Sequence, residues 1–121
     1  SRINAAGSPY IQDTVITGHD RDDLGALVFP NPEACKAMRP EELRTRLQAV
    51  FDHLALQSTG SSTRIARVLI MESPPSIDAS EVTDKGSINQ RAVLQHRAAL
   101  VEELYAEPPS PRVLQAAGGA R

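Results

Sequence analysis

Aromatic residues and cysteine are scarce in this sequence, and tryptophan is absent. Aromatic side chains make up 3% of the 121 residues, so Leu, Val, Ile and Ala must build the core. Proteins that bind single-stranded nucleic acids stack the bases on aromatic side chains. The formal net charge of −2 also provides no overall attraction to a phosphate backbone. We therefore expect no nucleic-acid partner.

The chain also lacks a signal peptide, a second cysteine and a long apolar run. Cys35 cannot form an intramolecular disulfide, and no stretch approaches the roughly 18 apolar residues that a transmembrane helix needs. These absences favour a cytoplasmic protein without a membrane partner. A first residue of Ser1 rather than Met suggests a fragment or a processed chain. The length fits one domain that needs a partner for two-substrate chemistry.

The first third of the sequence predicts a β-hairpin. Residues 10–17 and 24–29 are both rich in apolar and β-branched side chains, and a charged turn separates them. Pro30, Pro32 and Pro40 then interrupt a short segment that can form at most a brief helix. We expect this segment to link the hairpin to the elements that follow.

The rest of the chain predicts a helix, a strand and a second helix. After Pro40, apolar residues recur at helical spacing, so an amphipathic helix should run to about Gly60. Residues 64–71 are apolar and β-branched, which is typical of a short buried strand. A long helix is expected over residues 87–107, because its apolar stripe continues until Pro108 ends it.

Together these elements predict a small domain of the α+β class. Its sheet would have three strands, the N-terminal hairpin and one later strand, with the two main helices packed on it. The domain should span residues 1–107. Residues 108–121 are rich in Pro, Ala and Gly, and we expect them to form a flexible or loosely docked tail.

The most distinctive motif is the sequence TDKGSINQR, residues 83–91. Lys85 is one of two lysines, the other being Lys36, and Gly86 after it lets the loop approach a ligand closely. An ammonium group on such a loop can stabilise an anion that forms during a reaction. Ser87 is the expected N-cap of the following helix, in a capping box. Further polar residues could hold the loop or its helix: Thr83, Asp84, Asn89 and Gln90.

Other candidate sites have simpler explanations. Asp20, Asp22 and Gly25 match part of a calcium loop, but its fifth and twelfth positions lack ligands, so we expect a solvated turn. Residues 57–63 are rich in Ser, Thr and Gly but contain no lysine, which indicates a surface loop rather than a phosphate loop. The histidines lack metal-ligand spacing, and no nucleophile elbow supports a hydrolase triad. No metal site is expected.

Two stretches of the chain carry a family resemblance: TGHDRDDLG at residues 17–25, and EVTDKGSINQRAVL at residues 81–94. They are similar to the C-terminal domain of adenylate-forming acyl-CoA synthetases, the ANL superfamily, and most of all to feruloyl-CoA synthases. The resemblance extends over residues 3–106. The general superfamily form of the loop is closer to Thr-x-x-Gly-Lys, whereas Lys85 precedes Gly86 here.

This resemblance implies a two-step reaction. A carboxylic acid attacks the α-phosphate of ATP to give an acyl-adenylate and pyrophosphate, and the thiol of coenzyme A then displaces AMP. Residues 1–107 would be a lid that rotates between the steps against a large N-terminal domain of the same polypeptide. Lys85 would contact the carboxylate and the α-phosphate in the first step only. Arg64 and Arg67 flank the start of a strand, where ordinary surface solvation is the simplest expectation. Under the resemblance they are also candidate contacts for the phosphates of coenzyme A when the lid rotates.

The resemblance also implies that ATP, coenzyme A and Mg serve the full-length enzyme, with none bound to this fragment, which should be inactive alone. The substrate would be an aromatic or related carboxylic acid, such as a hydroxycinnamate. Two alternatives stay open. One is a non-catalytic α+β interaction module in which Lys85 is surface charge, and the other is an adenylating enzyme that loads the thiol of a carrier protein. Acetylation of Lys85 would stop adenylation by removing its charge.

Overall fold

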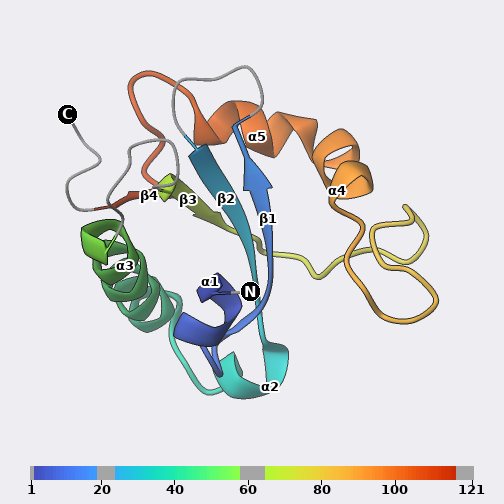
Figure 1. Ribbon diagram of the computed structural model, residues 1–121, viewed down its shortest axis with the longest axis horizontal. Helices are drawn as coiled ribbons and strands as arrows, with labels where there is room; N and C mark the ends of the chain where they lie inside the picture. Colours follow the sequence, from blue (N-terminus) through green and yellow to red (C-terminus); the bar gives the residue numbers. More distant parts are fainter. Residues whose placement is uncertain (1, 19–23, 58–64, 117–121) are drawn as a thin grey trace.

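The computed structural model describes residues 2–18, 24–57 and 65–116 (Figure 1). The helices and strands follow one another in the order α1 (Arg2–Ala6), β1 (Ile11–Thr17), β2 (Leu24–Pro30), α2 (Pro32–Cys35), α3 (Pro40–Gln57), β3 (Ile65–Ile70), α4 (Gln90–His96), α5 (Ala98–Leu104) and β4 (Val113–Gln115). The predicted hairpin, the first long helix and the later strand are therefore confirmed.

The four strands form one mixed sheet in the order β1-β2-β3-β4. β1 and β2 are antiparallel, with Val15 opposite Leu27, as expected for a hairpin. β2 and β3 are parallel, with Ala26 opposite Val68. Parallel neighbours need a crossover connection, and α3 provides it. β4 then pairs with β3 in the antiparallel direction.

Helices cover both faces of the sheet (Figure 1). One core cluster joins α3 to the sheet, and the other joins α4 and α5 to it. Along β2, Ala26 and Val28 belong to the first cluster, whereas Leu27 and Phe29 belong to the second. Because successive side chains of a strand point to opposite faces, this central strand is buried on both sides.

The C-terminal segment corrects two predictions, the three-stranded sheet and the loose tail. Val113–Gln115 pairs with β3, and the side chain of Leu114 is buried in the core beside α3. The guanidinium of Arg44 on α3 donates to the carbonyls of Pro111 and Arg112, at 2.6 and 3.0 Å. A three-residue strand among Pro, Ala and Gly is too short to show an alternating pattern, so the sequence did not predict it.

The predicted helix over residues 87–107 is in fact two helices. α4 and α5 meet at Arg97, where φ is −109° and ψ is 33°, outside the helical region. The apolar stripe continues across this break, since Val93 of α4 and Leu104 of α5 lie in the same core cluster. Apolar spacing alone therefore could not separate the two helices.

Close packing joins the end of the hairpin to α5. The hydroxyl of Thr17 is 2.8 Å from the hydroxyl of Tyr105 and shares a hydrogen bond with it. Gly25 lies opposite Thr17 in the sheet, and a methyl group there would come within 2.7 Å of Leu104 Cδ2. Glycine at this position therefore lets α5 approach β2 closely.

Candidate functional site

Lys85 lies near the tip of a small loop in the segment between β3 and α4, which extends on the side of the domain away from α3 (Figure 1). The two arms of the loop are paired by an antiparallel bridge between Val82 and Ile88. At its base, the backbone N–H of Asn89 donates to the carbonyl of Glu81 at 2.8 Å. Backbone pairing at two successive levels therefore gives the loop a defined shape.

The tip of the loop is closed around Thr83. The Thr83 N–H donates to the Ser87 carbonyl at 2.8 Å, and the Thr83 carbonyl accepts from the Gly86 N–H at 2.9 Å. The hydroxyl of Thr83 also accepts from the Ser87 N–H at 3.2 Å. Gly86 has a φ of +84°, in the left-handed region that glycine adopts at little cost. Thr83 and Gly86 thus shape the turn that carries Lys85.

The side chain of Lys85 is exposed and makes no hydrogen bond or ion pair with any other residue that the structure describes. Asp84, next to it in the turn, is exposed as well. Lys36, by contrast, lies 3.6 Å from the carboxylate of Glu33. Within the described part of the chain, the charge of Lys85 is therefore available to an anion that another molecule or domain supplies.

Asn89 has the N-cap role that the sequence assigned to Ser87. Its Oδ1 accepts from the backbone N–H of Ala92 at 3.2 Å, and its own backbone is extended. Gln90 is the first residue of α4 and is exposed, so the predicted capping box of Ser87 and Gln90 is wrong. Because Asn89 both closes the loop and caps α4, loop and helix are joined through one residue.

The candidate phosphate contacts, Arg64 and Arg67, are not brought to this loop. Arg64 lies outside the described residues. Arg67 on β3 forms an ion pair with Glu107, and its guanidinium lies 5.8 Å from the centre of the Tyr105 ring. Its side chain is 13% exposed. The charge of Arg67 is therefore already neutralised beside the end of α5.

A buried ion pair that sequence reasoning did not single out lies at the base of the loop. Glu81 is 0% and Arg97 is 7% exposed. Arg97 donates from Nε to Oε2 of Glu81 at 2.9 Å and from Nη2 to Oε1 at 3.0 Å. These hydrogen bonds lower the pKa of Glu81 to about 2, although burial opposes the shift. The signal in the sequence was a charged residue inside the apolar stripe of a helix, because such a residue requires a buried partner.

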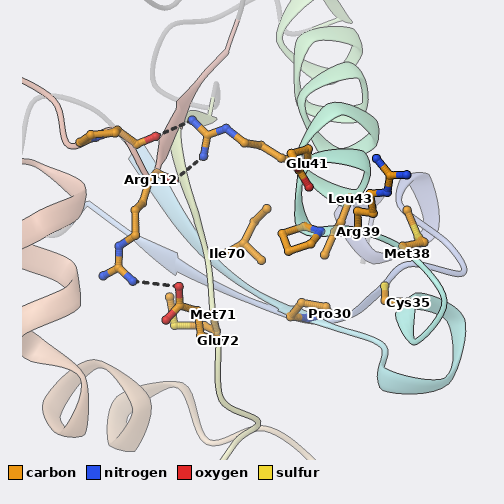
Figure 2. A pocket seen from close by; sticks show the side chains of 13 residues that line it. Pro30, Cys35, Met38, Arg39, Glu41, Leu43, Ile70, Met71, Glu72 and Arg112 are labelled. Carbon is orange, nitrogen blue, oxygen red and sulfur yellow. Dashed lines mark hydrogen bonds and ion pairs between the residues drawn. The ribbon is translucent and has the colours of Figure 1, made fainter.

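A groove of about 600 Å³ lies elsewhere, beside the start of α3 and the end of β3 (Figure 2). Figure 2 shows Arg112 turned toward Glu72 at its edge, with 3.1 Å between the charged groups. The groove has a partly apolar lining that includes Pro30, Cys35, Met38, Leu43, Ile70 and Met71. None of the residues that line it belongs to the Lys85 loop, so the groove and the loop are separate features.

The described residues include neither a cluster of metal ligands nor a helix that could span a membrane. No group of three or more His, Cys, Asp or Glu side chains in that part of the chain could hold a metal ion. No helix there is long and apolar enough to cross a membrane. Asp20 and Asp22 of the calcium-like turn and residues 58–63 of the Ser-rich loop lie outside the described residues. What the described site offers chemically is an exposed cation on a braced loop.

The sequence matches the family described as AMP-binding enzyme C-terminal domain over residues 1–108. It is 29% identical over 102 residues to a chloroplast long-chain-fatty-acid-(acyl-carrier-protein) ligase of Arabidopsis thaliana, covering 84% of this chain and 14% of the relative. A probable chloroplast acyl-activating enzyme of the same plant is 27% identical over 113 residues, covering 84% and 16%. The chain therefore spans only a small part of these relatives.

Solved structures of a carboxylic acid reductase from Segniliparus rugosus share the fold. Its A-PCP didomain in complex with AMP matches with a TM-score of 0.65 and 25% identity, covering 88% of this chain and 16% of that chain. Its A domain, in complex with AMP and a co-purified carboxylic acid, matches with a TM-score of 0.57 and 26% identity, covering 89% and 18%. The predicted α+β fold is thus confirmed, with a fourth strand added.

Proposed function

Since this chain belongs to the family of AMP-binding enzyme C-terminal domains, we propose that it supplies Lys85 to the adenylation step of an acid–thiol ligase. One observation carries this proposal: Lys85 is exposed, near the tip of a loop whose base is tied to a buried ion pair. The braced base constrains the backbone that carries Lys85. The absence of a partner among the described residues leaves its charge available for a substrate.

In the proposed first step, a carboxylate oxygen of the acid attacks the α-phosphorus of ATP. The bond from that phosphorus to the oxygen shared with the β-phosphate breaks, and pyrophosphate leaves with the electron pair. Lys85 would lie between the two anions and offset their repulsion. An ion pair at about 4 Å in an effective dielectric of about 20 amounts to roughly 4 kcal/mol. Loss of that interaction would slow adenylation on the order of a thousandfold.

The remaining parts of the active site would come from a large N-terminal domain of the same polypeptide. This proposal is supported by the lengths of the relatives, of which the chain covers 14–16%. ATP and the acid would bind chiefly to that domain, and Mg, where bound, would neutralise phosphate charge. We propose that this domain, with β4 as part of its sheet, acts as a lid on the large domain and does not catalyse the reaction alone, in a cytoplasmic enzyme.

In the proposed second step, a thiol attacks the acyl carbon and AMP leaves. We propose coenzyme A as the thiol and a hydroxycinnamate as the acid, because the chain resembles feruloyl-CoA synthases in residues 81–94. A carrier-protein thiol is a second candidate, since one relative is named as a ligase for acyl-carrier-protein and one structural neighbour contains a PCP domain. The full-length enzyme, supplied with ferulate, ATP and either thiol, would distinguish the two by which thioester forms.

The central experiment changes Lys85→Ala in the full-length enzyme and times the two half-reactions separately. Ferulate-dependent ATP–pyrophosphate exchange measures adenylation, and supplied feruloyl-adenylate measures thioester formation. We expect about a thousandfold loss in the first and a change within about twofold in the second. Lys36→Ala is the matched control, because Lys36 is the other lysine and is also exposed. Equal loss of both half-reactions would indicate a folding or docking defect, and no loss would favour an interaction module.

A further inference from the structure

The buried pair of Glu81 and Arg97 lies where the Lys85 loop leaves the body of the domain. Each oxygen of the Glu81 carboxylate contacts Arg97 and one further group. Besides Arg97, Oε1 accepts from the backbone N–H of Ser76 at 2.7 Å, and Oε2 lies 2.8 Å from Nδ1 of His96. Glu81 is therefore held by α4, by the junction after it, and by the turn that precedes the loop.

Arg97 extends this network to two further parts of the domain. Its Nη1 donates to the carbonyl of Ser73 at 3.1 Å, and its Nη2 donates to the carbonyl of Pro74 at 2.8 Å. Its guanidinium also lies 4.8 Å from the centre of the Phe29 ring, at the end of the central strand β2. One side chain thus ties the loop base to the core and to the segment that leaves β3.

The covalent path from this network to Lys85 is short on both sides. Glu81 is four residues before Lys85, and Asn89, whose N–H bonds to the Glu81 carbonyl, is four residues after it. Ser80, immediately before Glu81, has a φ of +61°, which is uncommon for a residue with a side chain. The surrounding bonds hold the chain in this conformation and so set the direction in which the loop starts.

Stability alone does not account for this arrangement. A buried ion pair adds little net stability compared with apolar side chains of similar size, because both charges lose their hydration. An apolar pair could fill the space, but it could not bind the carbonyls of Ser73 and Pro74 and a carboxylate at once. The forked guanidinium holds several segments in fixed orientations at once, as a residue that positions a loop must do.

We propose that Glu81 and Arg97 are positioning residues, which hold the Lys85 loop in the geometry that adenylation needs. The proposal rests on the proposed function of Lys85. Neither residue touches the reacting atoms, since both are buried beneath the loop. Their effect is carried by the backbone from Glu81 to Asn89, and a displacement of about 1 Å at a reacting centre can cost about a hundredfold in rate.

The test uses Arg97→Lys in the full-length enzyme, because lysine keeps the charge beside Glu81 but loses the fork. We expect the kcat of adenylation to fall by about a hundredfold, with the KM values for acid and ATP changed within about threefold. Thioester formation from supplied adenylate should stay within about twofold. Arg112→Lys is the matched control, because Arg112 forms a comparable forked pair with Glu103 on the surface. Adenylation that stays within about twofold in Arg97→Lys would overturn the proposal.

The outcome for Lys85→Ala separates this proposal from the one on which it rests. If Lys85→Ala leaves adenylation intact, the proposed function fails. If Lys85→Ala abolishes adenylation while Arg97→Lys does not, only the positioning role fails.

Amide hydrogen exchange on this chain provides a readout independent of activity. In Arg97→Lys, the N–H groups of Gly86 and Ser87 should exchange about tenfold faster or more, whereas those of Val28 and Leu69 in the core strands should not change. Equal acceleration of loop and core amides would show a general loss of stability instead, and would refute the positioning role.

Discussion

Lowering the pH below 4.5 should destabilise this domain through Glu81. In the folded chain, hydrogen bonds from Arg97 hold the pKa of Glu81 at about 2, against an ordinary value of 4.5. The unfolded chain therefore takes up a proton at a higher pH than the folded chain does, and protons favour unfolding. The stabilisation is complete above about pH 4.5 and is lost as the pH falls toward 2. The difference between the two pKa values corresponds to about 3 kcal/mol.

Urea unfolding followed by circular dichroism, at several pH values from about 6 to about 2, would measure this effect. The comparison is between the natural chain and Glu81→Gln, which keeps the shape of the side chain and removes the acid. Between pH 4.5 and 2, the natural chain should lose about 3 kcal/mol more of its free energy of unfolding than the variant. At pH 6, the free energy of unfolding of the variant should already be about 3 kcal/mol below that of the natural chain, because Arg97 is left buried without its counter-charge.

A surface pair supplies the control for this prediction. Hydrogen bonds from Arg112 and Ser110 also lower the pKa of Glu103 to about 2, but its side chain is 25% exposed. Water screens that pair, so Glu103→Gln should alter the pH dependence less than Glu81→Gln does. A carbon-detected NMR titration then follows the Glu81 carboxyl directly in the natural chain. The same titration in His96→Gln tests the contribution of His96, which contacts Oε2 of Glu81. A midpoint near 4.5 in the natural chain would refute the reasoning.

Four further outcomes are expected. Gly25→Ala should cost about 1–3 kcal/mol in urea unfolding, because its methyl group would overlap Leu104 and the Thr17 hydroxyl; an unchanged midpoint would contradict the close packing. Gly86→Ala should cost about 1–2 kcal/mol through its φ of +84° alone, since a methyl there meets nothing within 4 Å. Leu114→Ala should cost about 2–5 kcal/mol, whereas a loose tail would tolerate it. Enzyme acetylated at Lys85 should lose adenylation and keep thioester formation, and mass spectrometry of protein from cells grown with and without ferulate tests whether the modification occurs.

The elements with strong sequence patterns could be predicted, and the elements that depend on distant contacts could not. α3 shows helical periodicity, the hairpin consists of two β-rich runs around a charged turn, and β3 is a short apolar run between turn residues. β4 depends on the open edge of β3 and on the bonds from Arg44 to the backbone before it. Neither contact leaves a local pattern in residues 108–121, so tertiary structure decided the outcome there.

The same distinction applies to the candidate site. Lys85 could be selected as a candidate because lysine is rare in this chain and glycine follows it, and the structure places it on an exposed loop. The pairing of Glu81 with Arg97 joins residues 16 positions apart, across a turn, the loop and a helix. The sequence can indicate that Arg97 needs a buried partner, but it cannot choose among the acidic residues nearby, because the path of the loop decides which one is in reach.

Under the proposed function, the same loop must serve the first step and be absent from the second. A disordered loop could leave the active site without any movement of the domain. It would, however, lose conformational entropy each time it became ordered there. Here the base of the loop is fixed by Glu81 and Arg97, and Thr83 closes its tip, so the loop keeps one shape within the domain. The buried pair then sets where the backbone of Lys85 lies within the domain. Rotation of the whole domain would decide whether Lys85 is at the active site. A variant that weakens only the pair should slow the first step alone, whereas a variant that impedes rotation should slow both.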